Sequence, residues 1–167
     1  MGRIEAILLA AGYSSRMGRL KPLLPIGGTT VIRRQAEVLD GLTDRTIVVT
    51  GYRGDEVEAH LSGSRVTTVR NQAFAEGMFT SVKAGILALD QEVSAFLILP
   101  VDYPLVTRSL IEDLIEEFHH SGAPVLYPSF SMRKGHPPVI SAACIPDILS
   151  YQGDAGLKGA RSEERRV

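Results

Sequence analysis

The stretch that decides the fold lies at residues 4–21 and reads IEAILLAAGYSSRMGRLK. Residues 4–9 are mostly apolar, which is typical of a short β-strand buried in a parallel sheet. Small residues follow at positions 10–12, where a ligand can approach the backbone and its N–H groups can bind anionic oxygens. Arg16 and Lys21 then add positive charge in two forms, a planar fork and a point charge. The stretch therefore predicts an α/β fold with a phosphate site at the end of its first strand.

Segments typical of strands and helices alternate along the rest of the chain, as expected for a parallel sheet covered by helices. Further strands are predicted at residues 46–50, 65–69, 95–99, 125–127 and 139–140, and helices at 55–61, 81–89 and 141–149 and after N-caps at Thr29 or Thr30 and at Thr107. The predicted fold class is α/β, with a Rossmann-like three-layer α/β/α arrangement around a mostly parallel sheet. One domain at residues 1–160 is expected because no repeat, low-complexity tract or linker divides the chain. The charged residues 161–167 predict a frayed tail.

The composition indicates a local attraction for phosphate, confined to one loop. The 18 basic and 19 acidic residues give a net charge of −1. Because no field over the whole surface attracts nucleic acid or anionic lipid, neither nucleic acid nor a membrane is an expected partner. No apolar run approaches the roughly 20 residues that span a bilayer. Cys144 is the lone cysteine, which excludes an internal disulfide and fits a reducing compartment, so we expect a cytoplasmic protein.

Two common phosphate loops do not fit the residues after the first strand. A P-loop, G-x-x-x-x-G-K-[ST], places a lysine directly after its second glycine. Here five residues separate Gly12 from Gly18, and Arg19 follows. The dinucleotide fingerprint of hydride-transfer enzymes requires a glycine where Ser14 stands. Ligands of open parallel sheets bind at the carboxyl ends of the strands, so a different phosphate site is expected among the loops that follow the predicted strands.

The first loop resembles the signature of the MobA-like nucleotidyltransferase family, L-A-A-G-x-S-x-R-M-G followed by a lysine and by L-L-P-x-x-G. The matching residues are Leu9, Ala10, Ala11, Gly12, Ser14, Arg16, Met17, Gly18, Lys21, Leu23, Leu24, Pro25 and Gly28. Later blocks match in the same order: Asn71 with Gly77, Met78 and Ser81; residues 100–104 (PVDYP); residues 135–137 (GHP); and residues 153–156 (GDAG). Because the blocks spread over most of the chain, it is identified as a member of this family, which implies a fold of the nucleotide-diphospho-sugar transferase type.

The resemblance is greatest to one branch of the family. The Ala-Ala-Gly start and the Gly-His-Pro block resemble those of the molybdenum-cofactor cytidylyltransferases. This implies transfer of CMP from CTP to molybdopterin cofactor, a phosphorylated acceptor, with Mg²⁺ as cofactor and release of pyrophosphate. Catalysis of such a transfer consists mainly of positioning the reactants and neutralising charge on the phosphates.

The resemblance also implies roles for individual residues. Arg16 and Lys21 hold the triphosphate, with Lys21 nearest the α-phosphate, and Asp102 binds Mg²⁺ just past the strand at residues 95–99. One carboxylate is a sufficient anchor, because Mg²⁺ also takes substrate oxygens and waters as ligands. The nucleotide-binding residues are Leu9, Ala10, Ala11, Gly12, Arg16, Lys21, Asn71, Gly77 and Ser81. The acceptor-binding residues are His136, Gly153 and Asp154.

Each candidate side chain also has a purely structural interpretation. The interpretations are a solvated lysine for Lys21, a surface ion pair for Arg16, a helix cap or turn brace for Asp102, and turns for Asn71, His136 and Asp154. For the whole protein, two alternatives stay open. One is transfer to a sugar or polyol phosphate, and the other is non-catalytic binding of a nucleotide or molybdenum cofactor that helps to load a molybdenum enzyme.

The resemblance implies one more strand and helix after residues 153–156, with an Asp-rich D-x-D-T-P-type motif that supplies a second metal ligand. The sequence through Val167 lacks this motif. Either the chain is truncated or the metal relies on Asp102 and water. A missing edge element leaves an apolar patch that a second copy of the chain can cover, so a homodimer is a hypothesis.

Overall fold

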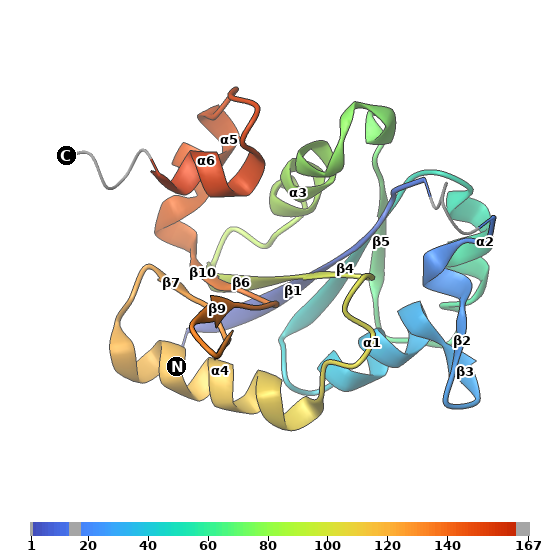
Figure 1. Cartoon of the computed structure of the whole chain (residues 1–167), viewed down its shortest axis with the longest axis horizontal. Coiled ribbons are helices and arrows are strands. Elements are labelled where there is room, and N and C mark those ends of the chain that lie inside the picture. The colour runs from blue at the N-terminus through green and yellow to red at the C-terminus, as the bar shows by residue number, and fades with distance from the viewer. Residues whose placement is uncertain (1, 14–17, 163–167) are drawn as a thin grey trace.

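A six-stranded sheet forms the centre of the molecule, as the computed structural model shows for residues 2–13 and 18–162 (Figure 1). The strand order is β5-β4-β1-β6-β10-β7. The bounds are β1 (Arg3–Ala10), β4 (Arg45–Thr50), β5 (Thr67–Arg70), β6 (Val93–Pro100), β7 (Val125–Leu126) and β10 (Val139–Ser141). Strands β5, β4, β1 and β6 pair in parallel, and β10 is antiparallel to β6 and to β7. The prediction of a mostly parallel sheet is confirmed.

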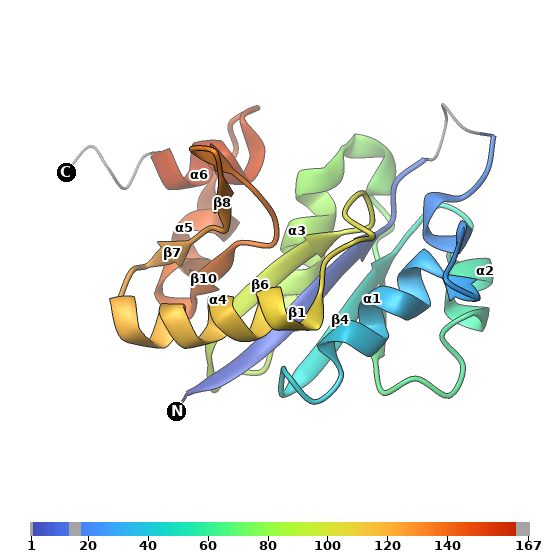
Figure 2. The ribbon, with the colours of Figure 1, turned by 60° about the horizontal axis from the view of Figure 1, so that its bottom comes forward.

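Helices cover both faces of this sheet. Figure 2 shows α1 and α4 in front of the sheet and α3 behind it. The helices that contribute to the front layer are α1 (Val31–Leu39), α2 (Gly54–Ala59) and α4 (Arg108–Ser121). Those of the other layer are α3 (Met78–Leu87), α5 (Ile145–Ser150) and α6 (Gly156–Ser162). The three-layer α/β/α prediction is therefore confirmed. None of the helices in the described residues is both long and apolar enough to cross a bilayer.

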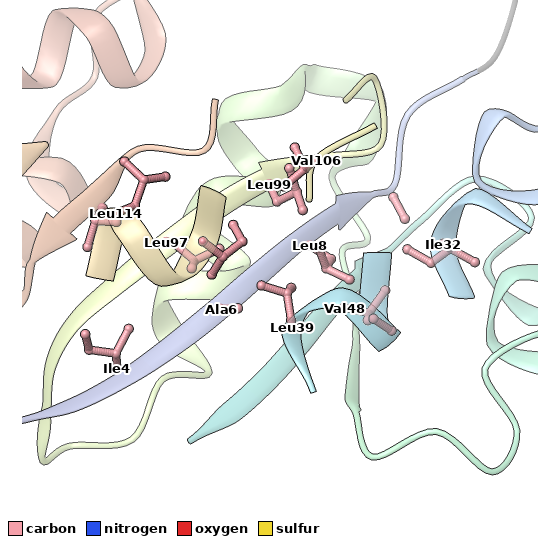
Figure 3. Close-up of a cluster of buried hydrophobic side chains, with 14 of the residues drawn as sticks. Ile4, Ala6, Leu8, Ile32, Leu39, Val48, Leu97, Leu99, Val106 and Leu114 are labelled. Carbon is pink, nitrogen blue, oxygen red and sulfur yellow. The ribbon is translucent and has the colours of Figure 1, made fainter. Parts of the chain in front are cut away.

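The two hydrophobic clusters follow from the alternation of side chains along the buried strands. In β1, Ile4, Ala6 and Leu8 belong to the cluster under α1 and α4, where Figure 3 shows them on one side of the strand with Leu39 and Leu114. Alternate residues of β1 belong to the cluster under α3 and α5. Both faces of β1 are buried, which explains why its sequence reads as an apolar run without a polar alternation.

Glu5 is the exception in the apolar run of β1, and its side chain is fully buried. Its carboxylate accepts a hydrogen bond from the Arg45 guanidinium at 3.1 Å and one from the Asp90 backbone N–H at 3.2 Å. The Arg45 guanidinium also donates to the Ala88 carbonyl. A buried carboxylate is tolerated when it is paired in this way, and the network ties β1 to β4 and to the turn before β6.

Several element boundaries differ from the sequence expectation. The α3 helix begins at Met78 instead of residue 81, directly after Gly77, whose φ of 114° ends the preceding turn. Residues 141–149 form a short 3₁₀ helix (Ala142–Cys144) and then α5, because Pro146 has no N–H and sits in the first turn of a new helix. Helix α6 was not predicted, and it includes residues 161 and 162 of the predicted tail.

Short elements account for the other differences. Neither the 3₁₀ turns at Lys21–Leu23 and Phe74–Glu76 nor the hairpins β2/β3 (Pro25–Ile26, Thr29–Thr30) and β8/β9 (Ser129–Phe130, Arg133–Lys134) were predicted. Strands of two residues are too short to show a periodic pattern. At the predicted N-caps, Thr107 accepts a hydrogen bond from the Leu110 N–H at 3.3 Å. Thr30 occupies the N-cap position of α1 without a capping hydrogen bond from its side chain.

The close approach of α3 to the sheet at Gly85 predicts that a larger residue at this position destabilises the fold. A Cβ at Gly85 would lie 2.5 Å from Ile7 Cγ2 and 3.2 Å from Val49 Cγ2. We expect Gly85→Val to lower the free energy of unfolding in urea by about 1–3 kcal/mol, because added carbons in a packed core force neighbours apart. Leu87→Val, on the exposed face of the same helix, is the control and should change it by less than about 0.5 kcal/mol. Equal stability of the two variants would contradict the packing argument.

Candidate functional site

A cavity of about 360 Å³ opens at the carboxyl ends of β1 and β6. The chain passes from β1 to β4 and β5 on one side and returns to β6 on the other, so this is the point at which the strand order reverses. Open parallel sheets bind their ligands at such a point. The predicted site residues that line the cavity are Leu9, Ala10, Ala11, Gly12, Lys21, Gly77, Ser81 and Asp102. Arg16 lies outside the described residues.

Lys21 and Asp102 form an ion pair at this cavity, with 2.7 Å between Lys21 Nζ and Asp102 Oδ1. Lys21 begins the 3₁₀ turn that follows the first loop, and Asp102 lies in the turn after β6. Both side chains are more than a third exposed, at 41% and 44%. Ion pairs at such exposure contribute about 0–1 kcal/mol. An anion that binds Lys21 or a cation that binds Asp102 can therefore separate the two groups at small cost in free energy.

The turn that carries Asp102 is held from below by α1. Gln35 is buried, and its Nε2 donates to the Pro100 carbonyl at 3.0 Å and to the Tyr103 carbonyl at 3.2 Å. The two carbonyls lie on either side of Asp102 in the sequence. Since Thr107 caps α4, the carboxylate of Asp102 is not used as the cap of that helix and faces the cavity with Lys21.

Asn71 lies behind the cavity wall, where its side chain is fully engaged. Its Nδ2 donates to Thr80 Oγ1 at 2.8 Å and to Ser81 Oγ at 2.9 Å, and its Oδ1 accepts from the Ala73 N–H at 3.0 Å. Its backbone N–H donates to the Thr50 carbonyl at 2.8 Å. Asn71 therefore closes a turn after β5 and orients the first turn of α3, which presents Ser81 to the cavity. A direct contact between Asn71 and a nucleotide stays a prediction.

His136 lies beside the turn that carries Asp102. Its ring stacks on the ring of Tyr103, with 4.4 Å between centroids and 31° between planes. The peptide bond between His136 and Pro137 is cis. Burial lowers the pKa of His136 below its ordinary value, which favours the neutral imidazole. The structure thus places His136 against Tyr103, the residue that follows Asp102, and His136 is not among the residues that line the cavity.

Gly153 and Asp154 lie in the loop between α5 and α6, on the same side of the sheet as α3. The loop is attached to α3 by an edge-to-face contact of Tyr151 with Phe79 and by a 2.7 Å hydrogen bond from Lys83 Nζ to the Tyr151 carbonyl. A Cβ at Gly153 would lie 2.3 Å from the Tyr151 hydroxyl, so a larger residue there would require the Tyr151 ring to move. Neither residue lines the cavity, and their contact with an acceptor stays a prediction.

Aromatic and apolar side chains that the sequence analysis did not name as site residues also line the cavity. Tyr13 and Phe74 are the largest, and Pro22, Ala75, Met78, Pro100 and Val101 complete the wall. Tyr13 directly follows the glycine of the first loop, and Phe74 lies in the loop after β5. The rule that ligands meet the carboxyl ends of the strands pointed to both loops, but no sequence motif indicated their aromatic residues.

The comparisons with known proteins agree with this geometry. The sequence profile of the MobA-like NTP transferase domain matches residues 6–167. The chain is 35% identical over 161 residues to the molybdenum cofactor cytidylyltransferase of Escherichia coli, which covers 96% of the chain and 81% of the relative. It is 32% identical to the nicotine blue oxidoreductase of Paenarthrobacter nicotinovorans, over 93% of the chain and 79% of that protein. A nucleotidyl transferase structure from Methanothermobacter superposes with a TM-score of 0.76 at 29% identity, over 95% of the chain and 80% of that structure.

The burial of His136 predicts a pH dependence. A pKa lowered in the folded state means that the unfolded chain binds the proton more readily, so stability falls as the pH decreases through the ordinary pKa of about 6.5. In NMR titration, we expect the His136 imidazole to titrate below about 6.5, and Tyr103→Ala to raise this pKa by uncovering the ring. In urea unfolding, His136→Gln should lose less stability than the natural chain between pH 7 and pH 5. A His136 pKa at or above the ordinary value would contradict this account.

Proposed function

The chain belongs to the MobA-like NTP transferase family, and we propose that it transfers CMP from CTP to a phosphorylated acceptor with release of pyrophosphate. Molybdopterin cofactor is the acceptor that we favour, because the Escherichia coli relative bears the name molybdenum cofactor cytidylyltransferase. The observation that carries the proposal is the pairing of Lys21 with Asp102 beside a cavity at the switch point of the sheet. This pair places an ammonium that can bind phosphate next to a carboxylate that can bind a metal ion.

The proposed reaction exchanges one phosphorus–oxygen bond for another. A phosphate oxygen of the acceptor attacks the α-phosphorus of CTP, and the bond from that phosphorus to the oxygen bridging to the β-phosphate breaks. The electron pair of this bond leaves with pyrophosphate, so the reaction needs no oxidant, reductant or covalent intermediate on the protein. The task of the protein is then to position the two phosphates and to offset their negative charge.

Lys21 has the central part in this proposal. Its ammonium leaves Asp102 and donates to non-bridging oxygens of the triphosphate, where it stabilises the charge that develops during transfer. Arg16, five positions before Lys21 in the sequence, is the second phosphate ligand in the proposal. The chain from Ala10 to Gly12 carries no side chain larger than a methyl group, so ribose and phosphates can lie directly against its backbone. Gly77 and Ser81 face them from the start of α3.

The donor set of the cavity fits a magnesium ion that enters with the nucleotide. Mg²⁺ takes one or two carboxylates together with substrate phosphates and waters, and Asp102 is the carboxylate among the described cavity residues. No group of three His, Cys, Asp or Glu side chains within the described residues could hold a metal alone. Asp102 and the phosphates therefore hold the ion in the proposal, and when bound it offsets phosphate charge.

The acceptor enters in this proposal on the side of the cavity where His136 lies beside the Asp102 turn. The neutral imidazole of His136 can donate one hydrogen bond and accept another. Gly153 and Asp154 are the other proposed acceptor residues, on the loop attached to α3.

The buried thiol of Cys144 suits a reducing compartment, and we place the reaction in the cytoplasm.

The first test measures pyrophosphate release with Mg²⁺, molybdopterin cofactor and each of the four ribonucleoside triphosphates. We expect release with CTP that depends on both the acceptor and the metal. Release with CTP only when a sugar or polyol phosphate replaces molybdopterin would change the acceptor in the proposal. Binding of CTP without release in any mixture would contradict catalysis and favour a nucleotide-binding protein that serves a molybdenum enzyme.

A second test removes the proposed phosphate ligand. Lys21→Ala should lower kcat for pyrophosphate release by roughly 100-fold or more, because charge stabilisation at the phosphorus is worth several kcal/mol. Arg19→Ala removes one positive charge from the same segment, at a residue that does not line the cavity, and should leave kcat close to that of the natural chain. An unchanged kcat in Lys21→Ala would exclude the role that we assign to Lys21.

A further inference from the structure

Three aromatic rings from three loops contact one another, and two of them, Tyr13 and Phe74, line the cavity. Tyr13 follows β1, Tyr52 follows β4 and Phe74 follows β5; we call them the aromatic cluster. The Tyr13 ring centroid lies 4.9 Å from that of Tyr52 and 5.2 Å from that of Phe74, and the other two are 6.3 Å apart. Tyr13 and Tyr52 remain 53% and 36% exposed. The rings thus contact one another while large apolar surfaces stay open to the solvent.

The cluster is held in place by the backbone beneath it. The Tyr52 N–H donates to the Ala11 carbonyl at 3.1 Å. Gly51 packs so tightly that a Cβ there would lie 2.7 Å from Phe74 Cβ and 2.8 Å from the Ala11 carbonyl oxygen. The Tyr52 backbone and the Phe74 Cβ are therefore held close to the end of β1, which restricts two of the three rings before a ligand binds.

The cluster and the ion pair lie on opposite sides of β1. In the sheet, β4 and β5 are on one side of β1, and β6 is on the other. The loops after β4 and β5 supply Tyr52 and Phe74, and the turn after β6 supplies Asp102. The small residues from Ala10 to Gly12 lie between, and among the described residues only the chain neighbours of Gly12 come within 4 Å of the position that a Cβ on Gly12 would occupy. The cavity therefore has an aromatic end and a charged end, separated by small residues.

We propose that the aromatic cluster binds the base of the nucleotide, with Tyr13 and Phe74 as the stacking surface and Tyr52 as the support behind Tyr13. This inference rests on the proposed function, because it takes the triphosphate to lie at Lys21 and Asp102. A nucleoside triphosphate has a flat aromatic ring at one end and negative charge at the other, which is the order of surfaces in the cavity. Stacking tolerates any base, since every base has a π-face.

The proposal assigns affinity to the cluster and leaves the choice of base to polar contacts. Removal of the Tyr13 ring should weaken CTP, GTP, ATP and UTP to a similar degree. Loss of one stacking contact corresponds to roughly 5- to 100-fold in the dissociation constant. Binding of a triphosphate that has no base should not change, because its phosphates contact the charged end alone.

The test compares CTP with inorganic tripolyphosphate, both with Mg²⁺, by isothermal titration calorimetry. We expect Tyr13→Ala to raise the dissociation constant of CTP by roughly 5- to 100-fold and to leave that of tripolyphosphate unchanged. Tyr13→Phe keeps the ring and should bind both ligands as the natural chain does. The chain contains five tyrosines and no tryptophan, so quenching of tyrosine emission by CTP, and its reduction in Tyr13→Phe, gives a second readout.

The outcomes separate this inference from the proposed function. Unchanged CTP binding in Tyr13→Ala overturns the role of the cluster and leaves the proposed function standing. Equal weakening of CTP and tripolyphosphate also overturns it, because the substitution then acts on the phosphate end. A natural chain that binds neither ligand overturns both. If Tyr13→Ala lowers thermal stability, Tyr13→Leu repeats the comparison with an apolar side chain of intermediate size.

Discussion

The parallel pairing of β1 with β4 on one side and β6 on the other is the constraint on which the rest of the molecule depends. Because the three strands run in the same direction, their carboxyl ends meet at one edge of the sheet. Burial of both faces of β1 requires helices in front and behind, and the crossovers that supply these helices leave their loops at the same edge. The cavity is thus a consequence of strand order, and the loops decide its chemistry.

Much of the fold could be predicted from the sequence because buried parallel strands have a strong signal. The apolar runs in β1, β4 and β6 correspond to strands that are buried on both faces. The Thr107 cap was recognisable from its position before an apolar helical stripe. Two-residue strands have no such pattern. Helix α6 was not predicted because three of its residues, Gly156, Gly159 and Ser162, are poorer helix formers than alanine or leucine.

The candidate site shows where sequence reasoning ends. The resemblance of the motifs assigned Lys21 and Asp102 to one site, but no local pattern relates residues 81 positions apart, so their direct contact required the fold. The sequence left two roles open for Asn71, a nucleotide contact and a turn. Its hydrogen bonds to Thr80 and Ser81 show that the side chain has a structural role. Tyr13 and Phe74 stand at positions that the signature leaves unspecified, and their contact depends on two separate loops.

The ion pair between Lys21 and Asp102 also affects which charged ligands the cavity binds. At 2.7 Å the two opposite charges offset each other, so a divalent cation or inorganic phosphate that approaches alone is attracted by one partner and repelled by the other. Either ion alone would have to break the pair and leave one partner without a counter-charge. Under the proposed function, a metal-bound triphosphate replaces both partners in a single event. The pair would then favour a ligand that brings both charges over either ion by itself, by no more than the roughly 0–1 kcal/mol that an exposed pair contributes.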